Sequence, residues 1–273
     1  MGATSGFDIS TVIPTYRRPE QLVEAIDSAL AQNVAGEIIV MDDCPDGSAA
    51  AAVAPYTSQP VRYFRHTPAS RGRPALVRNA GWKHATGRLV HFLDDDDRVA
   101  DGFYAEAIRR FDARPKTGVV FGHIRPFATS DAADLSHEVA FFSTASRRAR
   151  LAARLRLRSW LVANLLFKPT LLVNSACIVR RECIQALEGY HTDLELNEDV
   201  DFFCRAIRSF GFDFIDADVV HYRINPDSLM HGRPDDTAFA KVYKLMHRRY
   251  REHHGNLELM SLKLAMRTIG RFL

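Results

Sequence analysis

Several features that would assign a protein class directly are missing from this sequence of 273 residues. It has no run of about 18 uncharged apolar residues, the length needed to cross a bilayer. Its first residues also lack the basic start and apolar run of a signal peptide. The four cysteines are not spaced as metal ligands or redox pairs, so we expect buried thiols in a reducing compartment. These thiols favour a cytoplasmic protein, and the net charge of only +3 is too small to indicate a nucleic-acid partner, so none is expected.

The composition, with 47% hydrophobic and 25% charged residues, excludes a disordered chain and a small disulfide scaffold. Apolar strand-like runs alternate with amphipathic helical segments along the first part of the chain. We expect strands at residues 8–13, 37–41, 61–65, 88–93 and 117–122, and helices at 20–32, 74–86 and 101–112. This alternation predicts an α/β fold with a mostly parallel sheet and helices on both faces.

Polar residues follow three of the expected strands directly. Thr15 and Tyr16 follow the first strand, Asp43 follows the second, and the run Asp94–Asp97 follows the fourth. Because parallel sheets bind ligands at the carboxyl ends of their strands, we expect these side chains to form one site.

The run Asp94–Asp97 is the most distinctive motif in the chain. Adjacent carboxylates repel one another and resist burial, so they need a cation or an exposed edge. Their hard oxygens suit Mg²⁺ or Mn²⁺, which take their remaining ligands from phosphates and water. The alternative is a solvated acidic turn, with Asp101 capping the next helix.

A second acidic group, Asn197-Glu198-Asp199, opens an expected helix at residues 198–210. Carboxylates at a helix start can simply complement the helix dipole. Paired with a metal-diphosphate site elsewhere, one of them can instead act as general base on an acceptor hydroxyl.

Three sequence blocks together resemble one known family. They are STVIPTYRRPEQLVEAIDSALAQ with EIIVMDD, then RNAGWKHATGRLVHFLDDDD, then NEDVDFFCR. In this order they resemble a family 2 glycosyltransferase of the GT-A fold, over roughly residues 7–225. The resemblance implies a Rossmann-like, mostly parallel sheet with a helical C-terminal appendage. It divides the chain into a nucleotide-sugar-binding half (1–125), an acceptor and catalytic-base half (126–232) and a helical tail (233–273).

The resemblance also implies roles for individual residues. The expected donor contacts come from Pro14, Thr15, Tyr16, Asp43, Arg78, Asn79, Asp94 and Asp95. Asp96 matches the metal ligand for Mn²⁺ or Mg²⁺, Asp199 matches the catalytic base, and Glu198 is its neighbour. Two further sites depart from the family pattern or are ambiguous. Arg71 and Arg73 make the stretch before residue 74 unusually basic and suggest an extra diphosphate contact. His221 completes the metal shell, contacts the diphosphate, or is a hydrogen-bonded residue at a strand end. The other histidines, His66 among them, are expected at the surface or in packing.

Residues 139–181 contain no Asp or Glu, although they hold many arginines. Within this stretch Leu151, Leu155 and Leu157 alternate with arginines between Arg147 and Arg158, which predicts one or two basic amphipathic helices. Such a surface can dock on anionic lipid, cover an anionic acceptor, or be a solvated helix face over core leucines. A strand at 171–180, one or two strands at 212–223, and a helical tail from Asp235 complete the expected elements.

The sequence therefore predicts a metal-dependent inverting glycosyltransferase that uses a nucleotide-sugar donor, most readily a UDP-sugar. The acceptor is a glycan, a lipid-linked molecule or a small molecule. Peripheral contact with the cytoplasmic membrane face through Arg147–Arg158 is an added expectation. Two alternatives remain: a non-catalytic basic module that binds membrane or nucleic acid, and a sugar nucleotidyltransferase. The second is disfavoured because the loop after the first strand has neither the glycines nor the lysine of a phosphate loop.

Overall fold

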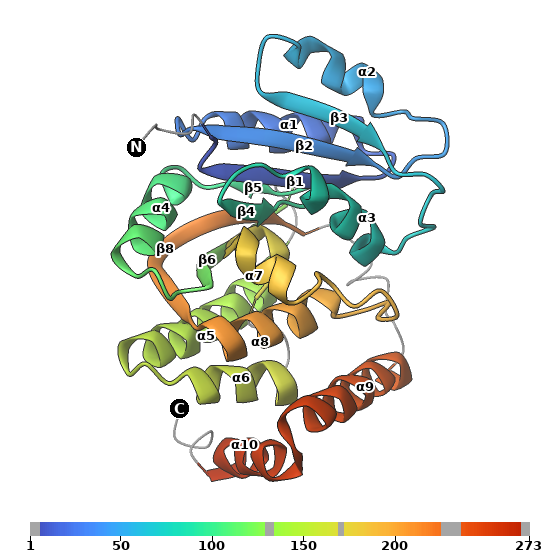
Figure 1. The fold of residues 1–273 in the computed structure, drawn as a ribbon. Coiled ribbons are helices and arrows are strands. Elements are labelled where there is room, and N and C mark those ends of the chain that lie inside the picture. The colour runs from blue at the N-terminus through green and yellow to red at the C-terminus, as the bar shows by residue number, and fades with distance from the viewer. Residues whose placement is uncertain (1–5, 129–133, 169–171, 225–235, 269–273) are drawn as a thin grey trace.

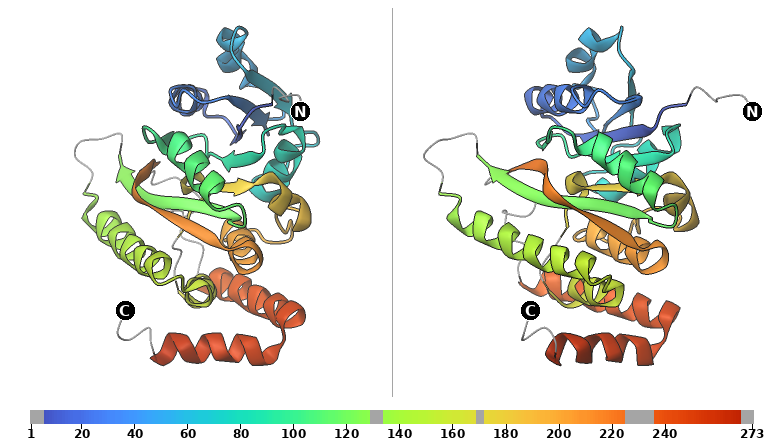
Figure 2. Two further views of the ribbon diagram at one scale, coloured as in Figure 1. Left: turned by 60° about the vertical axis from the view of Figure 1, so that its left-hand side comes forward. Right: turned by 90° about the vertical axis from the view of Figure 1, so that its left-hand side faces the viewer.

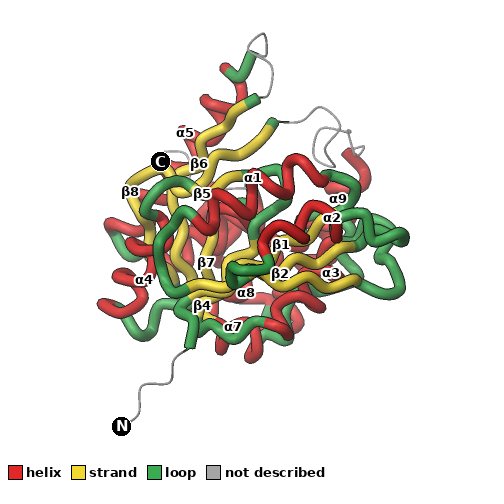
Figure 3. Tube along the Cα trace, turned by 90° about the horizontal axis from the view of Figure 1, so that it is seen from above, coloured by secondary structure: helices red, strands yellow, loops and turns green. Residues whose placement is uncertain are grey.

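The computed structural model describes residues 6–128, 134–168, 172–224 and 236–268 (Figure 1). Its centre is one eight-stranded sheet in the order β3-β2-β1-β4-β7-β6-β8-β5. The strands are β1 (Ile9–Thr15), β2 (Gly36–Asp42), β3 (Val61–Arg65), β4 (Leu89–Phe92), β5 (Arg98–Val99), β6 (Val119–Phe127), β7 (Cys177–Arg180) and β8 (Phe212–Arg223). Seen from above, they lie side by side from β8 through β4 to β2 (Figure 3).

The sheet is parallel in the first half and mixed in the second. The pairs β1–β2, β2–β3, β1–β4 and β6–β8 are parallel. Strand β7 lies antiparallel between β4 and β6, and the short β5 pairs antiparallel with β8. The α/β class and the strands expected in the first half are thus confirmed, while β7 joins the two halves into one sheet.

Helices cover both faces of the sheet. The α-helices are α1 (Pro19–Leu30), α2 (Ala50–Val53), α3 (Pro74–Gly81), α4 (Phe103–Ala113), α5 (Ser136–Arg154), α6 (Arg158–Phe167), α7 (Arg181–Ala186), α8 (Glu198–Phe210), α9 (Asp236–His254) and α10 (Asn256–Thr268). Short 3-10 helices are η1 (Ala54–Tyr56), η2 (Trp82–His84) and η3 (Asn174–Ala176). A proline in the first turn starts α1 and α3, where its missing N–H costs no hydrogen bond.

Strand side chains alternate between two apolar clusters, one on each face. Ile9, Ile13 and Val40 pack with α1 and α4, whereas Val12 and Ile39 pack on the face that carries α3, α6 and α8. This period of two explains why the strands read as continuous apolar runs: both of their faces are buried.

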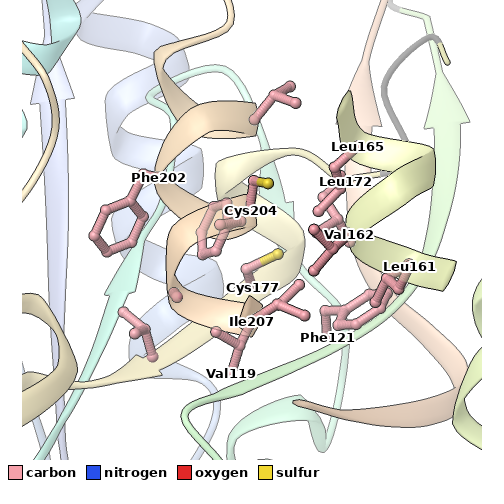
Figure 4. Packing of buried hydrophobic residues seen from close by; sticks show 14 of the residues in the cluster. Val119, Phe121, Leu161, Val162, Leu165, Leu172, Cys177, Phe202, Cys204 and Ile207 are labelled. Atoms are coloured by element: carbon pink, nitrogen blue, oxygen red, sulfur yellow. The ribbon is translucent and has the colours of Figure 1, made fainter. Parts of the chain in front are cut away.

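The second cluster ties α8 and α6 to the sheet (Figure 4). Phe202, Cys204 and Ile207 of α8 meet the strand residues Val119 and Cys177 there, and all five are buried. All four cysteines are free and buried, as expected. Helix α8 is therefore held by its apolar face, and its first residues lie at a fixed place beside the sheet.

The C-terminal helices form a layer beyond α6, which Figure 2 shows from two sides. Leu262 and Met266 of α10 and Met246 of α9 are buried in the same cluster as α6 and α8. The expected boundary at residue 125 falls inside β6, so the two halves share that strand. The expected strand at 171–180 is shorter, at Cys177–Arg180, and its first residue lies outside the described residues, as do 233–235 and 269–273 of the expected tail. Among the described residues, no helix is long and apolar enough to span a bilayer.

Candidate active site

The carboxyl ends of β1, β2 and β4 open into a cavity of about 1080 Å³. Parallel pairing places these ends at one edge, as the sequence predicts. The start of α8 lies on the same cavity, together with α5, α6 and α9. The predicted site residues in its wall are Pro14, Thr15, Tyr16, Asp43, Arg73, Arg78, Asp94, Asp95, Asp96, Glu198 and Asp199.

Asp43, directly after β2, is buried and held in a fixed orientation. Its Oδ1 accepts a hydrogen bond from the Ser70 backbone N–H at 2.7 Å, and its Oδ2 accepts one from the Ser70 hydroxyl at 2.6 Å. His66 Nδ1 lies 3.0 Å from Oδ1, so His66 has a specific partner beyond general packing. The sequence carries no signal for either partner, because both lie more than twenty residues away on another loop. A carboxylate fixed in this way can accept a hydrogen bond from a heterocycle N–H.

The four aspartates after β4 do not all face the cavity. Asp95 faces the loop after β1, where its Oδ2 accepts from the Thr15 hydroxyl at 2.8 Å and from the Tyr16 N–H at 3.3 Å. Asp97 is fully buried, and its Oδ1 accepts from the Arg223 N–H at 2.9 Å. Asp94, Asp95 and Asp96 line the cavity, whereas Asp97 braces β8.

Arg18 is a neighbour that motif spacing alone does not reveal. Its Nη1 lies 3.1 Å from Asp95 Oδ1 and 2.7 Å from Asp96 Oδ2. Burial raises the pKa of Asp95 to about 7, with a further rise from the charge of Asp96, while Arg18 opposes the shift. Burial and the charge of Asp94 also raise the pKa of Asp96. One guanidinium thus leaves the negative charge at this edge incompletely balanced.

Arg78 connects the two halves of the site. Its guanidinium is buried, with Nη2 2.6 Å from Asp94 Oδ1 and Nη1 2.7 Å from Glu198 Oε1. These two carboxylates raise its pKa against the effect of burial, so Arg78 stays charged. Since Glu198 is the first residue of α8, the ion pair positions the start of that helix against the acidic strand end.

Asp199 follows in the first turn of α8, next to Glu198 and facing the same cavity. Its Oδ1 accepts a hydrogen bond from the Val200 N–H at 2.7 Å. Burial and the charge of Glu198 raise its pKa to about 7, although Arg78 opposes the shift. A carboxyl that titrates near neutrality suits a general base at cellular pH, because it is ionised and still basic enough to take a proton.

In the part of the chain that the structure describes, the acidic strand end offers a divalent cation adjacent carboxylate ligands inside the cavity. Among the described residues, no three His, Cys, Asp or Glu side chains are grouped as a complete metal site. Asp95 and Asp96 nevertheless offer hard carboxylate oxygens, desolvated and sharing a single guanidinium. This donor set fits a cation that draws most of its ligands from a diphosphate and from water.

Asn79, expected to contact the donor, is hydrogen-bonded to another part of the protein. Its Nδ2 donates to the Tyr190 carbonyl at 2.8 Å, and its Oδ1 accepts from the Tyr190 N–H at 2.9 Å. The amide is therefore occupied in bracing the loop before α8 and lies outside the cavity wall. Arg73 also donates to that loop, at the Thr192 carbonyl, but remains in the wall. Arg71 is exposed and does not line the cavity.

His221, expected either at the metal and diphosphate or as a residue at a strand end, lies two positions before the end of β8. It lies on β8 in register with Arg98 of β5 and Arg125 of β6, outside the cavity wall. Side chains directly opposite in a sheet share a face, so His221 shares its face with two arginines and is unsuited to a cation. Its two neighbours further along the strand, Tyr222 and Arg223, both line the cavity.

Two bacterial biosynthesis proteins align with part of this chain. The succinoglycan biosynthesis protein ExoO of Rhizobium meliloti (strain 1021) is 38% identical over 107 residues, which are 39% of this chain and 30% of ExoO. The minor teichoic acid biosynthesis protein GgaB of Bacillus subtilis (strain 168) is 33% identical over 110 residues, 39% of this chain and 12% of GgaB. The aligned part of the chain thus spans less than a third of either relative.

Solved structures show the same fold at low sequence identity. The S. aureus TarS 1–349 complex with UDP-GlcNAc has a TM-score of 0.68 at 16% identity, covering 96% of this chain and 73% of that one. A mannosyltransferase from Pyrobaculum calidifontis, in complex with GDP-Man and Mn²⁺, has a TM-score of 0.59 at 16% identity, covering 97% and 75%. These likenesses identify the fold as GT-A. Residues 10–168, more than half of the chain, match the family model described as Glycosyl transferase family 2. The chain belongs to glycosyl transferase family 2.

Proposed function

We propose that this protein is a metal-dependent inverting glycosyltransferase that uses a nucleotide-diphosphate sugar, most readily a UDP-sugar. The observation that carries the proposal is one shared cavity. It joins the oriented carboxylate of Asp43, the acidic strand end Asp94–Asp96 and a carboxyl with a pKa of about 7 at Asp199. The UDP-GlcNAc bound to TarS supports the choice of donor.

On the donor side, each residue has a role that follows from its chemistry. Asp43 accepts a hydrogen bond from the nucleotide base, beside Pro14, Thr15 and Tyr16. Arg73 lies in the wall as a cation that suits the diphosphate. Asp96, with Asp95, would hold Mn²⁺ or Mg²⁺, which when bound neutralises the diphosphate as it leaves.

On the acceptor side, Asp199 acts as the base. Its carboxylate takes the proton of an acceptor hydroxyl as that oxygen bonds to the anomeric carbon of the donor. The bond between the anomeric carbon and the diphosphate oxygen breaks in the same step, and the nucleoside diphosphate leaves. A single displacement inverts the configuration at that carbon. Glu198 holds Arg78 and raises the pKa of Asp199, so it is a positioning residue.

The test combines binding and turnover. Binding of UDP-, dTDP- and GDP-sugars is measured with and without Mn²⁺, along with release of the nucleoside diphosphate. We expect Asp96→Ala to weaken metal-dependent binding at least about tenfold, since a hard oxygen ligand is lost. Asp199→Asn should keep binding and slow release about 100-fold or more. Asp101→Ala, which removes an exposed carboxylate outside the cavity, is the matched control. Absence of metal-linked nucleotide binding in the wild type would overturn the proposal.

We also propose peripheral contact with the cytoplasmic membrane face through the end of α5 and the start of α6. Arg147, Arg154, Arg156 and Arg158 are exposed there, whereas Arg150 pairs with Asp216 at 2.6 Å. Each exposed arginine near anionic lipid contributes about 1 kcal/mol. The fraction of protein that sediments with phosphatidylglycerol vesicles should fall in the triple variant Arg154→Gln, Arg156→Gln, Arg158→Gln. Equal binding to neutral vesicles would contradict this surface.

A further inference from the structure

The cavity has two sides of different chemistry. The strand ends and the start of α8 supply carboxylates, whereas α5, α6, α9 and the segment before η3 supply apolar side chains. We name this second side the acceptor wall, formed by Phe141, Phe142, Leu166, Phe167, Val173 and Phe239. At about 1080 Å³ the cavity is as large as the upper end of ordinary ligand pockets, about 1,000 Å³. It therefore has room for a second molecule beside a donor.

The acceptor wall exposes apolar surface that the core does not cover. Phe141, Phe167 and Val173 are only half-buried, although they pack against the two core clusters with their inner sides. Half-buried apolar side chains that line a cavity leave water against carbon. A ligand with an apolar portion would release this water.

Two polar side chains of α9 on this side of the cavity, Tyr243 and His247, already bond within the protein. The Tyr243 hydroxyl donates to the Lys168 carbonyl at 2.9 Å, and His247 Nε2 lies 2.6 Å from the Leu166 carbonyl. A sugar needs hydrogen-bond partners for its hydroxyls, and burying hydroxyls without them is costly. The wall is thus poorly suited to a purely saccharide acceptor.

A lysine lies at the edge of this apolar surface. Lys168 follows the last turn of α6, lines the cavity, and has no carboxylate within ion-pair distance among the described residues. An ammonium with no carboxylate partner in the described part of the chain, in a wall that also holds Phe167, suits an anionic group that is joined to an apolar one.

From these observations we propose that the acceptor is an amphiphile. Its hydroxyl-bearing head faces Asp199, its anionic linkage lies near Lys168, and its apolar chain lies on the acceptor wall. This inference rests on the proposed function, because it takes Asp199 as the base. It narrows the acceptor class from any hydroxyl compound to one with a phosphate-like linkage and a hydrocarbon chain.

The probes are butyl phosphate and octyl phosphate, which share a head group and differ by four methylenes. Binding is measured by calorimetry below their aggregation concentrations, with Mn²⁺ and the nucleotide found in the donor test both saturating. Burial contributes about fourfold in affinity per methylene, so we expect octyl phosphate to bind on the order of 100-fold more tightly. Phe167→Ala should reduce this preference about tenfold or more. Val139→Ala, on the exposed face of α5 and outside the wall, should leave it unchanged.

The neutral probe 1-octanol separates the chain from the charge. Lys168→Gln should weaken octyl phosphate about fivefold or more and leave 1-octanol unaffected. The inference is overturned if octyl phosphate binds less than about threefold more tightly than butyl phosphate. It is also overturned if this preference survives both Phe167→Ala and Phe141→Ala, or if the nucleotide displaces octyl phosphate. Displacement would place the phosphate in the donor site. If no nucleotide binds, the proposed function fails, and the chain-length comparison without nucleotide still shows whether the wall takes hydrocarbon.

Discussion

The pKa of Asp199 gives the sharpest prediction, because it connects one carboxyl to the whole activity profile. Burial and the neighbouring Glu198 raise that pKa to about 7. If Asp199 is the base, kcat/KM for the donor should rise with pH through about 7 and then level off. One pH unit below its pKa, a carboxyl is about one-tenth ionised, so at pH 6 the rate should be about a tenth of the plateau.

The perturbation is Glu198→Gln. It removes a like charge beside Asp199 and also frees the Arg78 guanidinium from its 2.7 Å ion pair with Glu198. Both changes favour the ionised form of Asp199, so its pKa should fall. The loss of one neighbouring charge moves a carboxyl pKa by roughly 1, and the midpoint of the profile should therefore fall to roughly 6.

The assay is the pH dependence of kcat/KM, which reports the ionisations of the free enzyme. Nucleoside diphosphate release is followed from pH 5 to pH 9 at constant ionic strength. Glu195→Gln is the matched control, because Glu195 also lines the cavity but is exposed and lies three positions before α8. Its midpoint should stay at about 7. A wild-type profile that is flat across this range, or a midpoint that Glu198→Gln leaves in place, would refute the assignment of Asp199 as base.

Three further predictions concern the supports of the site. Arg78→Met leaves two carboxylates without their shared cation, and urea unfolding should show a loss of about 3 kcal/mol; a loss below about 1 kcal/mol would contradict a stabilising bridge. Arg18→Met removes the guanidinium that contacts Asp95 and Asp96, so Mn²⁺ without nucleotide should bind these carboxylates more tightly. Electron paramagnetic resonance measures this affinity, and an unchanged value would show that Arg18 and Mn²⁺ do not compete for them. Gly189 has a φ of +77°, and a Cβ at this position would lie against the Asn79 side chain. Gly189→Ala should therefore lower the Tm; an unchanged Tm would show that the loop before α8 can shift to accommodate the methyl group.

Much of the fold could be predicted because its signals are local. Apolar runs that end in Asp42, Asp94 or Pro14 identify the strands of the first half, and parallel pairing then places their ends together. The direction of β7 could not be predicted, because an apolar run of four residues does not show whether its neighbours are parallel or antiparallel. The two-residue β5 is too short for any periodic signal.

For the site, motif positions predicted which residues reach the cavity but not which groups hold them. Ser70 contacts Asp43 from a distant loop, and Arg18 contacts the acidic run across the sheet edge. Asn79 lies next to Arg78 on α3, yet successive helix positions point in different directions and it braces Tyr190. The place of His221 could not be predicted from strand alternation either, because the successive residues Tyr222 and Arg223 both line the cavity.

Helix α9, near the C-terminal end of the described chain, forms part of the cavity wall. Phe239, Tyr243 and His247 of α9 are part of the cavity wall, whereas the family match ends at residue 168. The residues of our proposed donor site therefore lie within the family match, whereas part of the proposed acceptor wall lies after α8. If the proposal holds, substitutions in α9 should change acceptor binding and leave nucleotide binding in place.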